Sequence, residues 1–317
     1  MKKIMIFDTS VVSDNIGDFI IMDSVNKELK KLFTKDMFFY SFTHEKISKA
    51  TYKLNNISDY SFIGGTNLLS SNMDRYNQWK INVIDSFFIK DIILMGVGWW
   101  QYQTKPNFYT KYLLNKILHK NMIHSVRDSY TESMLKSIGI TNVINTGCPT
   151  MWELTLEHCR NIPCEKAENV VFTLTDYNKD FLNDQKLINI LLRNYKKVYF
   201  WPQGSRDLEY LYTLNNFEKI TILGGNLSSY DKLLDDFNIS LDYIGTRLHA
   251  GIRALQKSRR TIILAIDNRA TEKSKDFNLK VLPRNQIEKL ERLLRSKFIT
   301  EIYINEENIN KWKSQFQ

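Results

Sequence analysis

The strongest constraint on the fold comes from one stretch in the second half of the chain, residues 240–256, which read SLDYIGTRLHAGIRALQ. Residues 241–244 have the apolar character of a short buried strand, and Gly245 and Thr246 interrupt it. From Leu248 onward, apolar residues recur at i, i+4 and i+7, which is the spacing of one face of a helix. The stretch therefore predicts a strand that turns directly into a helix, as in a parallel α/β sheet.

Arg247 and His249 fall where this strand turns into the helix. The first N–H groups of a helix are unpaired and form the positive end of its dipole, so they favour an anion. Residues two apart on a regular helix point about 200° away from each other, so the two side chains can serve one ligand only if Arg247 lies in the turn. The pair fits a phosphate or carboxylate site with a proton-transferring histidine. It equally fits an ordinary helix N-terminus with a surface arginine and a hydrogen-bonded histidine.

Strand-like and helix-like segments alternate in two series, one before Pro149 and one after Glu168. Strands are predicted at residues 3–8, 37–42, 60–63, 91–95, 122–126 and 142–145, then at 169–174, 198–201, 219–223, 241–244, 261–266 and 280–282. Helices are predicted at residues 18–33, 75–88, 107–119 and 129–138, then at 184–194, 205–214, 229–237, after Arg247, and at 284–296 and 306–316. Such alternation with short connections predicts parallel sheets covered by helices on both faces.

The predicted fold class is α/β, with two Rossmann-like domains in a GT-B-like arrangement and ligands in an inter-domain cleft. Residues 1–155 form the predicted N-terminal domain, on the acceptor side, and residues 165–283 the C-terminal domain, on the donor side. Residues 284–317 are C-terminal helices, which in this architecture often cross back onto the N-terminal domain. The irregular stretch 149–168 is the predicted connection.

The composition is that of an ordinary soluble protein, with 43% hydrophobic and 25% charged residues. The formal net charge of +9 suits a small anionic substrate or an anionic membrane surface. Nucleic-acid binding is disfavoured because no recognised binding motif occurs. The three cysteines lack CxxC spacing, so neither a disulfide framework nor a zinc site is expected. Because the N-terminal apolar run is too short for a signal peptide and no run could span a bilayer, a cytoplasmic protein is expected, at most peripheral at the membrane.

Two motifs in the first half offer contacts for a sugar, and each has a simpler explanation. Asn15 and Asp18 surround Gly17 before the first long helix, where they could bind a hydroxyl, although Asp18 could equally cap that helix. Trp99 and Trp100 follow a glycine turn, where an exposed ring could stack on a sugar, although core packing is the commoner fate of such residues.

Three further polar residues follow predicted strands. Arg127 could be a second anion clamp or could pair locally with Asp128. Gln203 could contact a substrate hydroxyl or belong to a plain loop. Arg269 follows the strand after the helix of Arg247 and would lie beside the anion site, unless its loop is simply solvated. No metal-binding pattern stands out, and His124, within a predicted strand, is expected to be structural.

Six short motifs follow one another along the chain: Asn15-x-Gly17-Asp18, Gly64-Gly65, Gly96-x-Gly98, Ser125-x-Arg127-Asp128, Gly147-Cys148-Pro149 and Gly245-x-Arg247-Leu248-His249-Ala250. In this order they resemble the polysaccharide pyruvyl transferase family over nearly the whole chain, and the last motif is the most specific. The chain departs from the family pattern at three places: Thr66 in place of a third glycine, Trp99-Trp100 in place of a Gly-Pro-like ending, and Asp267-Asn268-Arg269 in place of a Tyr-Asp-x-Lys-like element. These departures concern the acceptor more than the reaction class.

The resemblance implies an enzyme that moves the pyruvyl group of phosphoenolpyruvate onto two hydroxyls of a sugar, forming a cyclic ketal in bacterial capsule, exopolysaccharide or cell-wall glycan synthesis. It implies His249 as general acid/base and Arg247 as a clamp on the donor. The other implied donor contacts are Arg127, Gly245, Leu248 and Arg269, and the acceptor contacts are Asn15, Asp18, Trp99, Trp100 and Gln203. Neither a metal nor a cofactor is required, phosphoenolpyruvate being a co-substrate.

The acceptor would be a sugar or a lipid-linked oligosaccharide, reached with contact to the inner membrane face in the second case. A GT-B glycosyltransferase that uses a sugar nucleotide is the nearest alternative function. A non-catalytic protein that binds a glycan or nucleotide is the alternative from another class.

Overall fold

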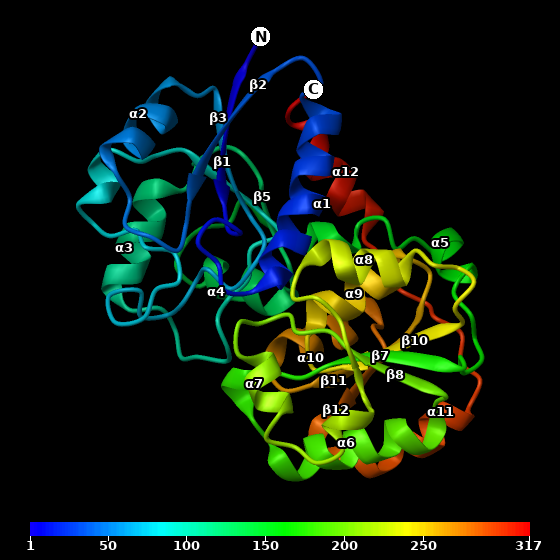
Figure 1. The fold of residues 1–317 in the computed structure, drawn as a ribbon. Coiled ribbons are helices and arrows are strands. Elements are labelled where there is room, and N and C mark those ends of the chain that lie inside the picture. Colours follow the sequence, from blue (N-terminus) through cyan, green and yellow to red (C-terminus); the bar gives the residue numbers. More distant parts are fainter. The chain divides into compact units, whose positions relative to one another are not determined.

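Two parallel sheets organise the chain, each within its own unit (Figure 1). The computed structural model describes all residues, 1–317. The first unit comprises Met1–Ser13, Ile21–Trp152 and Ile304–Gln317, and the second comprises Asp14–Ile20 and Glu153–Tyr303. The last helix, α12 (Glu306–Ser314), belongs to the first unit, whereas α11 (Leu290–Arg295) belongs to the second.

The sheet of the first unit has the strand order β2-β1-β3-β4. Its strands are β1 (Lys3–Asp8), β2 (Met37–Phe42), β3 (Tyr60–Gly64) and β4 (Ile92–Met95), and β5 (His124–Val126) pairs in parallel with β6 (Val143–Asn145). The helical segments are α1 (Ile16–Leu32), α2 (Lys49–Ile57), η1 (Asp85–Phe87), α3 (Phe108–Ile117), α4 (Ser129–Lys136), η2 (Pro149–Met151) and α12. Val97, two residues after β4, forms an isolated parallel bridge with Val126, the last residue of β5, so the end of β5 lies beside the chain that leaves β4.

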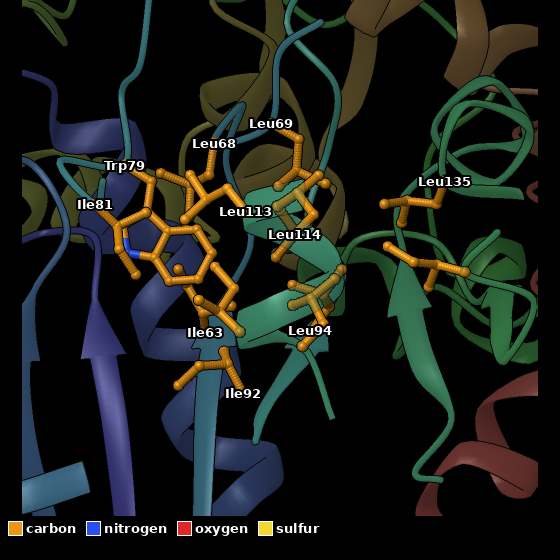
Figure 2. Packing of buried hydrophobic residues seen from close by; sticks show 14 of the residues in the cluster. Ile63, Leu68, Leu69, Trp79, Ile81, Ile92, Leu94, Leu113, Leu114 and Leu135 are labelled. Carbon is orange, nitrogen blue, oxygen red and sulfur yellow. The ribbon is translucent and has the colours of Figure 1, made fainter. Parts of the chain in front are cut away.

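Alternation along the strands divides the core of this unit into two layers. In β1, Ile4 and Ile6 pack with α1 and α12, whose contributions include Trp312. Met5 and Phe7 point to the opposite face and join the layer of α3 and the loops. Figure 2 shows this second layer, in which Leu113 and Leu114 of α3 gather with strand residues and Trp79. The period of two therefore buries both faces of the sheet.

The sheet of the second unit has the order β12-β11-β10-β7-β8-β9, which is the doubly wound Rossmann order. Its strands are β7 (Asn169–Thr173), β8 (Lys197–Phe200), β9 (Thr221–Ile222), β10 (Leu241–Gly245), β11 (Arg260–Ala265) and β12 (Val281–Pro283). Its helices are α5 (Leu156–Arg160), α6 (Phe181–Asn194), α7 (Asp207–Leu211), α8 (Leu227–Leu234), α9 (Leu248–Gln256), α10 (Asn268–Phe277) and α11, with single turns η3 (Asp176–Asn178), η4 (Phe217–Lys219) and η5 (Arg284–Lys289). The order of strands reverses between β7 and β10, where open sheets of this kind bind ligands.

A close approach fixes α9 on this sheet. A Cβ at Gly251 would lie 2.7 Å from Ile263 Cγ1 and 2.8 Å from Tyr243 Cε1, so only glycine fits there. From α8, the Tyr230 hydroxyl donates to the Ala250 carbonyl at 2.9 Å. The N-terminal end of α9 is thereby held at the carboxyl end of β10.

The prediction of a helix over residues 75–88 is wrong. This segment contains only the short turn η1. Trp79 and Ile81 are instead buried in the core layer of Figure 2, and the Asn82 side chain accepts from the N–H groups of Ile84 and Asp85 to start η1. Core burial of residues two apart favours extended chain over a helix.

Three helices, α2, α5 and α10, were missed by the sequence patterns. Neither α2 nor α10 was predicted, because both are polar with few regularly spaced apolar residues. Asp128 is the N-cap of α4 and accepts from Thr131 N–H at 2.8 Å. None of the helices combines the length and the apolar composition needed to cross a membrane.

His124 is a fully buried part of the first unit, with both ring nitrogens engaged. Its Nδ1 accepts from Leu94 N–H at 3.2 Å, and its Nε2 lies 2.9 Å from the His119 carbonyl oxygen, to which it donates. Burial lowers the pKa of His124 to about 4.

We expect this histidine to make the protein acid-sensitive. As the pH falls below the ordinary histidine pKa of about 6.5, His124 is protonated in the unfolded chain, whereas in the folded chain it stays neutral until about pH 4. The folded protein therefore loses stability as the pH falls from about 6.5 to about 4. The loss attributable to His124 reaches about 3 kcal/mol at the acid end. Urea unfolding of the wild type and of His124→Asn at several pH values measures it. Equal pH slopes for the two proteins would contradict the assignment.

Candidate active site

The candidate site lies at the carboxyl edge of the second sheet, where β7 and β10 end side by side. A Cβ at Gly245 would lie 2.4 Å from Thr173 Oγ1 and 2.7 Å from its backbone nitrogen, so glycine is required at this point. Beyond the strands, Thr246 N–H donates to the Thr173 carbonyl at 3.2 Å. The Thr246 hydroxyl also lies 2.8 Å from that of Thr175. The two loops that leave the switch point are therefore tied together.

Arg247 lies in the turn and not in the helix. This position is the one that would let Arg247 and His249 contact the same ligand. Its φ of −88° and ψ of 103° are non-helical, and it is the N-cap residue of α9. Its N–H donates to Thr173 Oγ1 at 3.2 Å, and its carbonyl accepts from the Tyr243 hydroxyl at 2.7 Å. His249 is the second residue of the helix and is 6% exposed. Leu248, which is also buried, opens the helix between them.

The guanidinium of Arg247 is held by two carboxylates from other loops. Its Nε and Nη2 bind both oxygens of Asp207, with Nε to Oδ2 at 2.9 Å. Nη2 also binds Asp176 Oδ1 at 2.8 Å, and Nε donates to the Leu174 carbonyl at 3.1 Å. With 5% of the residue exposed, Arg247 is not a surface side chain, and its Nη1 is the guanidinium nitrogen outside these contacts.

Asp207 is completely buried and joins three loop segments. Besides Arg247, it accepts from the N–H groups of Gly204 at 2.7 Å, Gln203 at 3.2 Å and Asp176 at 3.1 Å. Burial raises the pKa of the Asp207 carboxyl, while Arg247 and the backbone donors oppose that rise. Burial also lowers the pKa of Arg247, but attraction to Asp207 outweighs it and leaves that pKa above its ordinary value. With donors on both oxygens, Asp207 is best satisfied as a carboxylate, so the two form an ion pair.

The loop after β8 adds two constraints. A Cβ at Gly204 would lie 2.1 Å from Arg247 Nη2, so the guanidinium occupies the space that a side chain would need. Gln203 donates from Nε2 to Asn15 Oδ1 at 2.7 Å, which brings two predicted acceptor residues together. Gln203 Oε1 is buried without a hydrogen-bond partner, and the same holds for Asn268 Nδ2 at the start of α10. Leaving such a group unsatisfied costs about 1–3 kcal/mol, and a ligand could offset that cost.

Arg269 follows β11 and reaches the same edge through Tyr177. Its Nε and Nη2 bind Asp267 Oδ2 at 2.9 and 2.6 Å, and Nη2 also contacts the Tyr177 hydroxyl. The Tyr177 ring centre lies 5.1 Å from Arg247 Cζ, within the range of a cation–π contact. Burial lowers the pKa of Arg269, but Tyr177 and Asp267 outweigh burial and leave that pKa above its ordinary value. The tyrosine therefore bridges two predicted donor residues.

The predicted site residues of the first unit have local partners. Arg127 is buried, binds Asp128 Oδ2 through Nε at 2.9 Å and donates to the Trp99 carbonyl at 3.2 Å. Trp99 is completely buried, and its indole N–H lies 3.0 Å from Gln103 Oε1. The interpretation of Trp99 as a sugar platform is corrected, because no face of its ring is open. Trp100 is partly exposed and stacks on Tyr76 with ring centres 3.9 Å apart.

Asp18 is buried within the first turn of α1 and does not occupy the cap position. The residue before the helix is Asn15, whose Oδ1 accepts from Gly17 N–H at 3.1 Å. No group of three or more histidine, cysteine, aspartate or glutamate side chains is arranged to hold a metal ion.

Two residues of the site, Asp176 and Tyr177, were not predicted from the sequence. Both follow β7, and the rule that ligands bind beyond the carboxyl ends of strands could have drawn attention to them. Asp207 is 40 residues from Arg247 along the chain, and no local pattern indicated that its carboxylate holds the Arg247 guanidinium.

The chain matches one protein family in sequence and solved structures in fold. The sequence profile of polysaccharide pyruvyl transferase matches residues 15–268. Among solved structures, the MnaA–UDP co-structure from S. aureus has a TM-score of 0.58 at 11% identity, covering 99% of this chain and 97% of that chain. A crystal structure of Acinetobacter baumannii MurG has a TM-score of 0.42 at 9% identity, covering 100% of this chain and 94% of that chain. A search of curated proteins gives no match.

The likeness to MnaA is one of fold alone, and that fold is of the GT-B type. It agrees with the predicted α/β class and its two Rossmann-like sheets, whereas the inter-domain cleft stays a prediction. Because the family profile spans most of the chain and includes the turn of Arg247 and His249, the protein belongs to the polysaccharide pyruvyl transferase family.

Proposed function

We propose that the protein transfers the pyruvyl group of phosphoenolpyruvate to two hydroxyls of a sugar and forms a cyclic ketal. The observation that carries the proposal is the head of α9, where Arg247 lies in the turn and His249 in the first helical turn, at the switch point of a Rossmann-ordered sheet. A donor with both a phosphate and a carboxylate suits a site of arginines and helix N–H groups.

The chemistry needs one proton donor, one base and a stabilised leaving phosphate. Protonation of the donor's methylene carbon makes the adjacent carbon electrophilic, and a sugar hydroxyl adds to that carbon and gives up its proton. The bond to the phosphate oxygen then breaks, phosphate leaves, and the second hydroxyl closes the ketal with loss of its own proton. We assign the proton transfers to His249, which lies in the first turn of α9, two residues after Arg247.

The assignment of Arg247 follows from how its guanidinium is held. Asp207 and Asp176 fix the orientation of the planar fork through Nε and Nη2, so Nη1 remains for the phosphate or carboxylate of the donor. In this scheme Asp207 is a positioning residue and Arg247 touches the donor. Arg269, with the backbone at Gly245 and Leu248, completes the donor side. Arg127 has no role in the scheme because Asp128 and Trp99 hold its guanidinium.

The acceptor side of the scheme uses Asn15, Asp18 and Gln203, whereas Trp100 stays a prediction from the sequence. Gln203 Oε1 needs a donor, and a sugar hydroxyl is a suitable one. The acceptor would be a free or lipid-linked sugar with two neighbouring hydroxyls.

The proposal predicts binding of phosphoenolpyruvate and not of sugar nucleotides. We expect calorimetry to detect phosphoenolpyruvate binding to the wild type and at least tenfold weaker binding to Arg247→Ala, because one desolvated charged contact is worth about 1.5–3 kcal/mol. UDP-glucose serves as the competing ligand. Binding of UDP-glucose without binding of phosphoenolpyruvate would favour the glycosyltransferase alternative. With a panel of methyl glycosides, phosphate release that requires both substrates would support the transfer itself.

A further inference from the structure

The first unit carries an exposed apolar surface that the catalytic scheme does not use. We define the α3–η1 surface as Ile84, Phe87, Phe88, Phe108, Tyr112 and Lys116. Phe108 is 83% exposed, Ile84 70% and Phe87 66%, which is unusual for such large side chains. Large apolar side chains gathered on a surface mark an interaction site more often than chance exposure.

The members of this surface are neighbours. Phe108, Tyr112 and Lys116 follow one another at four-residue intervals and so share one face of α3. Lys116 Nζ lies 5.9 Å from the centre of the Phe87 ring, which joins α3 to η1. Ile84 and Phe88 flank the short turn that contains Phe87. The opposite face of α3, with Leu113 and Leu114, points into the core (Figure 2).

The exposed rings rest on a well-anchored base. The Tyr52 hydroxyl donates to Asp85 Oδ1 at 2.6 Å, and its ring stacks on that of Phe88 with centres 4.8 Å apart. Val83 N–H donates to the Tyr109 hydroxyl at 3.2 Å. These bonds also turn the Asp85 carboxylate inward, where it is 5% exposed. The surface therefore presents apolar side chains on a fixed backbone, and the one carboxylate of η1 is not exposed on it.

The chain segment that carries this surface is strongly positive, and Lys116 lies beside Phe87. From residue 80 to residue 120 the chain has two carboxylates, Asp85 and Asp91, against six exposed lysines. The lysines are Lys80, Lys90, Lys105, Lys111, Lys116 and Lys120. Lysine is depleted at protein–protein interfaces, whereas aromatic side chains with lysines are the usual combination at an anionic membrane surface.

We propose that the α3–η1 surface docks on an anionic lipid bilayer. Phe87, Phe108 and Ile84 enter the boundary between headgroups and acyl chains, and lysines of the same segment, Lys111 and Lys116 on α3 among them, bind headgroup phosphates. The two contributions act together, since neither a few exposed side chains nor a basic patch alone holds a protein firmly on a membrane. This inference does not depend on the identity of the donor, and it concerns residues outside the proposed catalytic machinery.

Flotation of the full-length protein with lipid vesicles tests the inference. The vesicles contain two parts phosphatidylcholine to one part phosphatidylglycerol, and vesicles of phosphatidylcholine alone are the lipid control. We expect the wild type to float only with the anionic vesicles, and high salt to weaken the binding. Phe87→Ala/Phe108→Ala and, separately, Lys111→Glu/Lys116→Glu are each expected to lower the bound fraction about tenfold or more.

A matched variant on the second unit tests whether vesicle binding belongs to this surface or to exposed apolar side chains in general. Phe181→Ala/Leu182→Ala removes two exposed apolar side chains of α6, which are 54% and 67% exposed, and should float as the wild type does. Equal loss in this variant, or no flotation of the wild type with anionic vesicles, would overturn the inference. So would a change in oligomeric state by light scattering in Phe87→Ala/Phe108→Ala with unchanged vesicle binding, because the surface would then be a protein interface. A circular dichroism spectrum and a thermal midpoint equal to those of the wild type show that the variants are folded.

Discussion

Replacement of His249 by alanine is expected to lower turnover by about 10²–10⁴-fold, the usual contribution of a general acid or base. His249 follows the turn of Arg247 by two residues at the N-terminal end of α9, so its ring is the titratable group that the proposed scheme uses. Affinity for phosphoenolpyruvate should change much less than turnover, since the arginines and the helix N–H groups remain. Steady-state kinetics with calorimetry of donor binding measures both quantities.

Arg253→Ala provides a control on the same helix. Arg253 binds Asp231 through Nε and Nη2 at 2.8 and 2.7 Å and has no part in the scheme. Its removal should leave turnover within about twofold, because a partly exposed ion pair contributes about 1 kcal/mol or less to stability and nothing to the reaction. Unchanged turnover in a folded His249→Ala protein would remove the histidine from the mechanism. Equal losses in both variants would show that damage to α9, and not loss of the acid, is responsible.

Replacement of Asp207 by alanine is expected to cost about 3–5 kcal/mol of unfolding free energy, the range for breaking a buried ion pair. The completely buried carboxylate accepts from Arg247 and from three backbone N–H groups. Without the Asp207 carboxylate, the Arg247 guanidinium keeps only Asp176 and the Leu174 carbonyl as hydrogen-bond acceptors. The Gly204 N–H also loses its acceptor. Urea unfolding followed by circular dichroism measures the change.

Asp231→Ala is the matched control, because it removes the carboxylate of the less buried Arg253 pair. It should cost about 1 kcal/mol or less. A double variant, Arg247→Met/Asp207→Leu, should regain much of the stability lost in Asp207→Ala, since it leaves no uncompensated charge, yet it should not bind phosphoenolpyruvate. If Asp207→Ala proves no less stable than Asp231→Ala, the buried pair is not the structural centre of this edge.

The local part of the fold could be read from residue order. Strands β1 and β2 have the predicted limits, Lys3–Asp8 and Met37–Phe42, because each is an apolar run with polar residues at its ends. The turn and helix around Arg247 and His249 were predicted on the same basis. Where periodicity was weak, prediction failed: α10 was read as a loop, since Ala270 and Phe277 are nearly its only apolar residues.

The error over residues 75–88 has a different cause. Its apolar residues are numerous enough for a helix, but Trp79 and Ile81 enter the core of the first unit from an irregular chain. The Phe87 ring, by contrast, stays outside under Lys116. Which apolar residues of a segment are buried depends on the surface that they meet, and residue order does not contain that surface.

The sequence by itself determined the α/β class, the membership in a family and a strand-to-helix turn near Arg247 and His249, because these depend on the order of residue types along the chain. The structure then placed Arg247 in the turn, before α9 begins. Only the tertiary structure decided what Arg247 does. Its partners Asp176 and Asp207 are 71 and 40 residues away along the chain and meet it because parallel strands end at one edge of the sheet. The structure likewise shows that Trp99 is buried and so cannot stack on a sugar, and that Gln203 donates a hydrogen bond to Asn15. Burial and long-range pairing are properties of the folded chain, so no local pattern could have specified them.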